Sequence, residues 1–426
     1  MGGKAAILLV LGFSMIFLVA GSNFNRVAST SVDNVHEYYL HTNAFNIAVS
    51  AANIAAREIF FDPTWTEGFN NRAFAGGTMS ASVEIVNTFH NIRRITATGV
   101  YQGSVNTIRI LLRPGRFSLF AYYSANEPSG IWWTTGDEVT GPMHVQGILN
   151  VSGRPIFRGR VTTEEGLNLS GSWQTQRVWN GRRWVNQQVW VPDPNNDPQF
   201  LGGYSTGINL EMPDDGIPDL ITLANEDGRV FNHDTVYIKF EADSIKYKFA
   251  KANNYTAEPA ISFSSNGVIC AQNSVLRIEG TVKGQFTVVS TGSNPKGKIF
   301  LDDDIVYFSN PQTFPKSEDI LGIVAQNDIM VTNNTPNQSS INIHAAVYSQ
   351  SGGFGAESYN TGTNRGHINL YGGISQHTRR AVGTIGTGST IATGYSKNYV
   401  YDQRFRLASP PHFPATGSFQ MTSWLE

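Results

Sequence analysis

The chain has little charge for its length and almost no cysteine. Charged residues make up 15% of its 426 residues, against about 25% in a typical soluble domain. The 31 basic and 33 acidic residues give a formal net charge of -2, so no long-range positive field exists and we expect no nucleic-acid partner. The single cysteine, Cys270, excludes an intrachain disulfide and any CxxC metal site.

The signatures of common enzyme classes are also missing. The sequence has no GxSxG elbow, no P-loop and no GxGxxG motif, and its nine histidines lack zinc-binding spacing. The most concentrated acidic run, Asp302-Asp303-Asp304, lies between two apolar segments. Successive residues of a strand point to opposite faces, so three acids in a row cannot converge on one cation. We interpret this run as a solvated turn and expect a non-enzymatic protein.

Glycine is abundant instead, with 42 residues. From residue 63 onward, short apolar segments alternate with turns of Gly, Asn, Asp or Ser, which is typical of β-structure. Three units repeat the order glycine, short apolar strand, glutamine, at residues 141–146, 267–272 and 322–326. A recurrent unit of this kind favours a parallel β-solenoid. A β-sandwich, which would be built from hairpins, is the alternative.

A long apolar run lies at the start of the chain. Residues 5–21 read AAILLVLGFSMIFLVAG, carry no charge and follow Lys4. A membrane-spanning helix needs about 17–25 apolar residues, so this run predicts an anchor. A cleaved secretory signal and a buried core helix are the alternatives. The side chains that we expect to face lipid are Leu8, Leu11, Phe13, Ile16 and Phe17.

The helical pattern continues beyond the apolar run. No proline occurs before Pro63 and no glycine occurs between Gly21 and Gly68, so nothing interrupts one helix from about residue 5 to about residue 61. The second half is amphipathic and needs a surface to pack against. Its apolar residues recur with helical spacing: Phe45, Ala48, Val49, Ala52, Ala55, Ala56 and Ile59.

A short leader ending in Gly2-Gly3 precedes Lys4, the apolar run, and the segment NAFNIAVSAA at residues 43–52. This arrangement resembles the N-terminus of type IV pilin-like proteins, particularly minor pilins. In that family a prepilin peptidase cuts after the leader glycine, and the apolar half-helix serves first as a membrane anchor and later as the filament core. The resemblance implies cleavage between Gly3 and Lys4. It also implies two partners, the lipid bilayer and other pilin-like subunits.

Two positions depart from the family pattern. Cleavage after Gly3 places Lys4 and Leu8 at the first and fifth positions of the processed chain, where major pilins carry Phe and Glu. That glutamate pairs with a neighbouring subunit's N-terminus, so its absence favours a minor subunit. Long domains translocate regardless of charge. We therefore expect an inner-membrane anchor in a bacterial cell envelope, or a surface filament, with residues 22–426 outside the cytoplasm.

A tryptophan-rich region occupies residues 164–260. Asn180-Gly181 lies between aromatic segments, which predicts a β-hairpin with a type I′ turn. The rings of Trp179, Trp184 and Trp190 are candidates for stacking on a sugar. They suit a small core of this region equally well, which is the interpretation that we favour.

Alternating oxygen-bearing side chains follow the tryptophans at Asp193, Asn195 and Asp197. A hard cation such as Ca²⁺ is bound by carboxylate and carbonyl oxygens, so these residues are a candidate Ca²⁺ site. A polar turn is the alternative, and we favour it because a complete EF-hand pattern is absent. The sequence indicates no other cofactor.

Further segments of the body are residues 141–147, 155–163, 353–357, 394–402, 410–414 and 423–426. They resemble an uncharacterised extracytoplasmic domain of bacterial envelope proteins that carry pilin-like N-termini. This resemblance implies a location and an architecture, and it implies no activity.

Together these features predict a mainly β protein with a long N-terminal transmembrane and amphipathic helix, followed by a parallel β-solenoid-like domain with a β-rich insertion. The expected parts are a leader and helix, a first β region, a tryptophan-rich insertion, and a solenoid-like domain with a C-terminal cap: 1–62, 63–163, 164–260 and 261–426. The expected function is that of a non-enzymatic pilin-like subunit or minor pilin. A surface carbohydrate-binding or polysaccharide-processing β-helix protein is the alternative.

Overall fold

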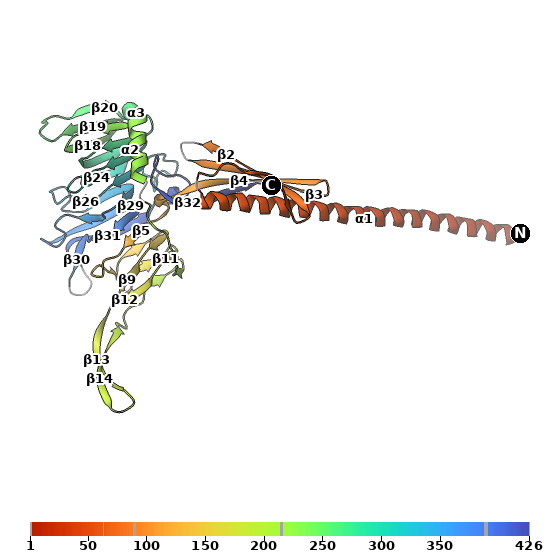
Figure 1. The fold of residues 1–426 in the computed structure, drawn as a ribbon, viewed down its shortest axis with the longest axis horizontal. Coiled ribbons are helices and arrows are strands. Elements are labelled where there is room, and N and C mark those ends of the chain that lie inside the picture. The colour runs from red at the N-terminus through yellow and green to blue at the C-terminus, as the bar shows by residue number, and fades with distance from the viewer. Residues whose placement is uncertain (1, 63, 88–90, 214–215, 387–390, 426) are drawn as a thin grey trace. The chain divides into compact units, whose positions relative to one another are not determined.

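The computed structural model describes residues 2–62, 64–87, 91–213, 216–386 and 391–425 (Figure 1). The protein is mainly β, with 48% strand and 21% helix, as the sequence predicts. Contacts between residues divide the chain into two compact units. Unit 1 comprises residues 1–114 and 418–426, and unit 2 comprises residues 115–417.

Helix α1 (Gly2–Phe61) is a single uninterrupted helix of 60 residues, which confirms the continuous helix expected from the sequence. Its side chains are exposed from residue 3 to residue 39. From Ala44 onward the apolar stripe is buried. Figure 1 shows the first part of α1 extending without any neighbouring element of unit 1.

An antiparallel sheet covers the second half of α1. Strands β1, β2, β3 and β4 follow one another in antiparallel pairs, and β32 is next to β4 at the edge. Their bounds are β1 (Phe69–Phe74), β2 (Gly77–Asn87), β3 (Ile92–Tyr101), β4 (Ser104–Arg116) and β32 (Ala415–Leu425). The last strand therefore joins a sheet whose other members precede residue 117.

Small residues let the helix approach this sheet closely. Ala48, Ala52 and Ala55 are fully buried, and Ile59 fills the end of the same core. A Cβ atom added to Gly99 of β3 would lie 2.2 Å from the carbonyl oxygen of Ala44, closer than any real contact. The amphipathic pattern of the sequence thus corresponds to the face that packs on the sheet.

Unit 2 is built from parallel ladders of short strands. In the first ladder each strand pairs in parallel with the next. In spatial order its members are β17 (Arg229–Phe231), β21 (Val268–Ala271), β23 (Gln285–Ser290), β25 (Ile320–Ala325), β27 (Ile341–Ser349), β29 (Asn364–Thr378), β5 (Tyr122–Asn126), β8 (Met143–Val145), β11 (Val161–Thr163) and β16 (Tyr204–Ser205).

A second parallel ladder runs beside the first and shares β27 and β29 with it. Its other members are β18 (Thr235–Ala242), β22 (Val275–Val282), β24 (Lys298–Tyr307), β31 (Ile391–Tyr401), β7 (Glu138–Val139), β10 (Ile156–Phe157) and β15 (Gln199–Phe200). A branch from β24 continues through β26 (Ile329–Val331) to β28 (Phe354–Ala356). A third, shorter ladder contains β6 (Trp133–Thr134), β9 (Ile148–Ser152) and β12 (Gly166–Leu169).

The ladders are not stacked in chain order. The early strand β5 pairs with the late strand β29, through Ile374 opposite Tyr122, and Figure 1 shows the two side by side in orange and blue. The chain therefore enters unit 2 in the middle of the stack. Helix α2 (Gly216–Glu226) comes between β16 and β17, which are at opposite ends of the first ladder.

The pairing in unit 2 has the parallel sense that a solenoid requires. Among the strands that the structure describes there, antiparallel pairs occur at β13–β14, at β18–β19–β20 and at β30–β31. The bounds of the strands not yet given are β13 (Gly171–Trp179), β14 (Trp184–Pro192), β19 (Ser244–Phe249), β20 (Thr256–Pro259) and β30 (Gly383–Ile385). A sandwich would instead be antiparallel throughout.

The three glycine–strand–glutamine units of the sequence are β8, β21 and β25, and all three belong to the first ladder. Cys270, in β21, is fully buried, as its apolar neighbours predict. Burial raises the pKa of its thiol to about 12.

The boundaries expected from the sequence differ from those of the structure. Residues 164–260 do not form one insertion, because β15, β16, β17 and β18 from this range are members of the parallel ladders. The range 63–163 is likewise shared between the two units. The strands that pair with these four lie in other parts of the sequence. The sequence alone therefore does not reveal where the structural units begin and end.

Candidate functional site

The exposed half of α1 contains the predicted membrane anchor. This helix is long and apolar enough to cross a membrane, and its apolar window is 0% buried. Gly3 and Lys4, the predicted cleavage position, lie in its first turn. Cleavage and anchoring stay predictions. The predicted anchor side chains are each more than half exposed: Leu8, Leu11, Phe13, Ile16 and Phe17.

The hairpin predicted around Asn180-Gly181 is present. Strands β13 and β14 pair from Gly171 to Trp179 and form a two-stranded sheet of their own. The turn is wider than predicted, because residues 180–183 separate the strands. The Asn180 side chain accepts hydrogen bonds from the backbone amides of Arg182 and Arg183, at 3.0 and 2.9 Å. Asn180 therefore caps a longer loop and does not begin a two-residue type I′ turn.

Four tryptophans pair across this hairpin. The ring centroids of Trp173 and Trp190 are 5.6 Å apart, and those of Trp179 and Trp184 are 5.9 Å apart. The rings thus contact each other, while each remains between 39% and 66% exposed. Sugar stacking by Trp179, Trp184 and Trp190 stays a prediction.

The candidate Ca²⁺ residues have partners of their own in the loop that follows β14. Asp193 accepts hydrogen bonds from the backbone and side-chain nitrogens of Asn195, both at 2.9 Å. Asp197 forms an ion pair with Arg154 at 2.9 Å. Across the described part of the chain, no group of three or more His, Cys, Asp or Glu side chains is placed to hold a metal ion. This geometry is that of a polar turn.

A large cleft of about 1090 Å³ opens in unit 2. Segments distant in sequence line it, at residues 128–137, 328–330, 356–367, 378–385 and 395–397. Parallel pairing joins β7 to β31 and β28 to β26. Hydrogen bonds from the Ala356 amide to the Ala381 carbonyl and from the Thr393 hydroxyl to the Tyr359 carbonyl connect the two groups. The cleft is larger than the pockets of about 300–1000 Å³ that hold most small ligands.

Two ion-paired cations, the buried Arg379 and the largely buried Lys397, line this cleft. Arg379 pairs with Glu127 at 2.8 Å, and Lys397 pairs with Asp137 at 2.7 Å. Both cations lie over the ring of Trp133, at 4.3 and 4.9 Å from its centroid. Burial lowers the pKa of Lys397, and the attraction of Asp137 offsets only part of that effect.

The rim of the cleft carries a third cation and an aromatic side chain. Arg380 donates to Asp328 through Nε at 3.0 Å, and its side chain is 48% exposed. Lys298 also approaches Asp328, at 3.5 Å. Trp132 and Tyr359 are half-buried lining residues. The cleft therefore offers charged pairs, a neutral overall balance and aromatic surface.

A much smaller space of about 10 Å³ adjoins the cleft and shares Arg379 and Lys397 with it. That volume is enough for about one water molecule. Trp133 also lines it, and the buried Nε1 of Trp133 has no hydrogen-bond partner among the residues that the structure describes.

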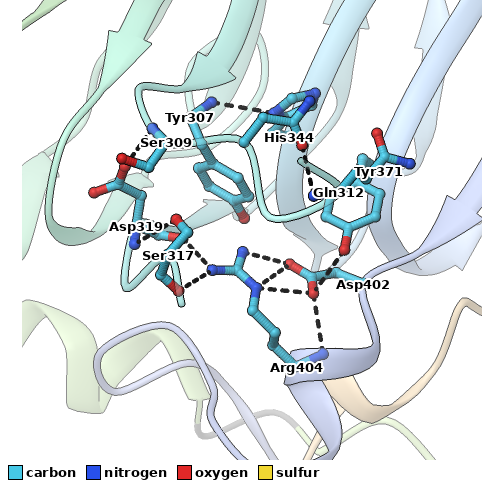
Figure 2. Close-up of polar contacts among 10 residues, drawn as sticks. Tyr307, Ser309, Gln312, Ser317, Asp319, His344, Tyr371, Asp402 and Arg404 are labelled. Atoms are coloured by element: carbon cyan, nitrogen blue, oxygen red, sulfur yellow. Dashed lines mark hydrogen bonds and ion pairs between the residues drawn. The ribbon is translucent and has the colours of Figure 1, made fainter. Parts of the chain in front are cut away.

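A second polar cluster lies elsewhere on the ladders (Figure 2). Tyr307, His344 and Tyr371 come from adjacent strands, and their ring centroids are 5.2 and 5.7 Å apart in turn. The Tyr371 hydroxyl donates to Asp402, which is fully buried and paired with Arg404 at 2.6 Å. Burial lowers the pKa of His344, and nearby Asp402 opposes that effect.

The same cluster fixes a loop and the C-terminal segment of unit 2. Arg404 donates to the carbonyl oxygens of Ser317 and Asp319, at 2.8 and 3.0 Å. The Asp319 carboxylate accepts hydrogen bonds from the amides of Gly284 and Ser309. These groups bond to one another and to the backbone, so we interpret the cluster as a structural clasp.

The structure corrects the interpretation of Asp302, Asp303 and Asp304 as a solvated turn. All three lie within strand β24, at an irregularity where the pairing with β22 shifts register between Leu301 and Ile305. Asp302 accepts hydrogen bonds from Arg277 and from the Thr332 hydroxyl, the latter at 2.7 Å. Asp304 accepts from the backbone and side chain of Asn342, and Asp303 alone of the three is exposed. Partners distant in sequence, which the local pattern does not reveal, hold this bulged run within the strand.

The sequence did not predict the cleft. The adjacent pairs Trp132-Trp133 and Arg379-Arg380 are visible in the sequence, but nothing local indicates that they meet. They are brought together because β29 pairs with β5 across more than 200 residues of chain.

No protein-family model matches the chain, and no curated protein matches it. Among solved structures, the chain is similar to the competence-associated pilin ComZ from Thermus thermophilus, with 12% identity and a TM-score of 0.37. The match covers 91% of this chain and 98% of that one. A TM-score of this size does not establish a shared fold, so a function for this chain rests on its own helix and its own cleft.

Proposed function

We propose that this chain is a non-enzymatic, pilin-like subunit, anchored in a bacterial membrane by residues 5–21 and carrying a β-solenoid outside the cytoplasm. The observation that carries the proposal is the division of α1 into a bare apolar half and a half that is buried on its own sheet. Burying a large apolar side chain stabilises it by about 1.5–3 kcal/mol. A helix with its apolar residues exposed from residue 7 to residue 19 therefore requires lipid or other helices around it.

Assembly follows from the same argument. The apolar half leaves the bilayer and is surrounded by the equivalent helices of neighbouring subunits, so its surface stays out of water throughout. Lys4 and Leu8 at the start of the processed chain favour a minor subunit. The parallel ladders of unit 2 support the solenoid, and Ca²⁺ is not needed for any step.

The test is the mature N-terminus. Protein isolated from membranes would be measured by intact mass and N-terminal sequencing, and we expect it to begin at Lys4. A Gly3→Val variant should remain uncut while a Gly21→Val variant is still processed. An unprocessed wild-type chain would indicate a plain anchor, and a chain beginning near residue 22 would indicate a cleaved signal. Either result would contradict the proposal.

Helix association can be tested by cross-linking, because the single native cysteine is buried. A Leu18→Cys variant should form disulfide-linked dimers in membranes, since Leu18 is 73% exposed on the bare half. The matched control is Ile261→Cys, at a position in unit 2 that is 96% exposed. Equal cross-linking of both variants would point to random collision and against assembly through the helix.

A further inference from the structure

We propose that the large cleft of unit 2 binds a neutral oligosaccharide. This goes beyond the assembly role of α1 and does not depend on it, because every residue of the cleft belongs to residues 115–417. The chemistry of the lining, its aromatic surface and its volume each indicate this class of ligand.

The charge balance of the lining favours a neutral ligand over an ionic one. Arg379, Arg380 and Lys397 are each paired with an acid within 3.0 Å. An incoming anion would have to compete with these carboxylates, and an incoming cation would have to compete with these three basic groups. The lining also carries Glu357, whose carboxylate accepts a hydrogen bond from the Asn333 amide. With it, three acidic residues balance three basic residues in the lining, so attraction by net charge is absent.

A hydroxyl group suits paired charges better than an ion does. It donates one hydrogen bond and accepts two, so it can contact a carboxylate and a guanidinium at the same time. The Asp137 carboxylate accepts from Lys397 and from the Thr134 amide through one and the same oxygen, so it has acceptor positions beyond those that its pair occupies. Arg380 is about half exposed at the rim. Adjacent hydroxyls, as on a sugar ring, can therefore bond to these pairs without breaking them.

The aromatic wall supplies the complementary apolar contact. Trp132 and Tyr359 line the cleft and are only partly buried, so part of each ring is free to meet a ligand. A sugar ring has an apolar C–H face beside its hydroxyls, and aromatic rings offer large apolar area together with a polar group. Polar pairs beside partly exposed aromatic rings thus match both sides of one sugar.

The volume and the rigidity of the cleft indicate more than one sugar unit. A space of about 1090 Å³ exceeds the pockets that enclose one drug-sized molecule. Arg379 and Lys397 are held by buried ion pairs and by the Trp133 ring. Binding then orders few side chains, which lowers its entropic cost.

The test uses the full chain in detergent micelles and isothermal titration calorimetry. The neutral probes are cellohexaose, maltohexaose and the hexamer of N-acetylglucosamine, and the charged probes are a galacturonate hexamer and a thymidine hexanucleotide. We expect saturable binding of at least one neutral probe with a Kd below about 1 mM. Binding of a charged probe alone, or of none, would overturn the proposal.

Two variants place the ligand in the cleft. Trp132→Ala removes aromatic surface, and Arg380→Gln removes a rim donor while Lys298 remains beside Asp328. Each should weaken binding by about tenfold, with far-UV circular dichroism confirming that both fold. The matched controls are Trp184→Ala in the hairpin and Arg158→Gln, an exposed ion-paired arginine. Loss of binding in Trp184→Ala with no loss in Trp132→Ala would assign the ligand to the hairpin and overturn the proposal.

Discussion

Arg379 and Glu127 form an ion pair with side chains that are 3% and 0% exposed, and 2.8 Å separates Nη1 from Oε2. Burial by itself lowers the pKa of Arg379, but the attraction of Glu127, Tyr122 and Asp137 and the hydrogen bond to Glu127 together outweigh burial and raise it overall. Glu127 also accepts hydrogen bonds from the hydroxyls of Tyr122 and Ser124. The pair joins residues 252 positions apart, so it connects the two chain segments that meet where β5 pairs with β29.

The first prediction concerns this pair. Glu127→Gln leaves Arg379 buried without a compensating charge, and breaking a buried pair in this way costs about 3–5 kcal/mol. Denaturant unfolding of the full chain should show this decrease in the free energy of unfolding. Glu138→Gln is the control, because Glu138 and Arg158 are 40% and 52% exposed, and exposed pairs contribute at most about 1 kcal/mol. Equal losses for the two variants would contradict the argument.

The second prediction concerns the contact between α1 and its sheet. In Gly99→Ala the new Cβ would lie 2.2 Å from the Ala44 oxygen and 2.5 Å from the Ala48 nitrogen. The helix must move away, at a cost of about 1–3 kcal/mol. Amide hydrogen exchange over residues 44–59 should become faster. Gly147→Ala is the control, since nothing lies within 4 Å of its added Cβ, and unchanged exchange in both variants would count against tight packing.

The third prediction concerns the anchor. Leu11→Arg places a charge within the apolar run, which costs about 2.5–3.5 kcal/mol on insertion scales. The variant should be depleted from the membrane fraction after ultracentrifugation. Tyr38→Arg provides the comparison, because Tyr38 is 73% exposed on α1 but lies outside the run. If the Leu11→Arg variant associates with membranes as well as the Tyr38→Arg variant does, the anchor prediction is wrong.

The fourth prediction concerns pH. Burial lowers the pKa of His344, so between that value and the ordinary value of about 6.5 the unfolded state binds the extra proton. The resulting stability is fully present above about pH 6.5 and is lost as the pH falls through the lowered value. The melting temperature of the wild type should fall between about pH 7.5 and about pH 5.5. The melting temperature of the His344→Asn variant should fall less over the same interval. An identical fall in the two proteins would show that His344 does not contribute to this pH dependence.

The fifth prediction separates the three adjacent acids of β24. Asp302→Asn weakens a carboxylate that is 16% exposed and bonded to Arg277 and Thr332, so we expect a loss of about 1–3 kcal/mol. Asp303→Asn alters an exposed side chain and should stay within about 0.5 kcal/mol. Thermal melts with and without added Ca²⁺ also test the metal alternative, because a bound cation would raise the melting temperature of the wild type.

The sequence alone determined the features that depend on local pattern. The unbroken helix of α1 follows from the absence of proline and from 3.6-residue spacing, which act on neighbouring residues. The β class, the Asn180 hairpin and the burial of Cys270 follow in the same way from turn residues and apolar runs. The glycine–strand–glutamine units even identify strands of one ladder, because each unit repeats the same local geometry.

Tertiary structure alone decided which of these segments meet. A parallel ladder pairs strands through backbone hydrogen bonds, which do not require particular side chains. The pairing of Tyr122 with Ile374 could therefore not be predicted from the sequence. The same pairing brings Trp132 and Arg379 to one cleft, and the pairing of β31 with β29 adds Lys397. Asp302 shows the limit most simply. Its sequence neighbours suggested a solvated turn, whereas it lies in a bulge of strand β24 and pairs with Arg277 on the adjacent strand.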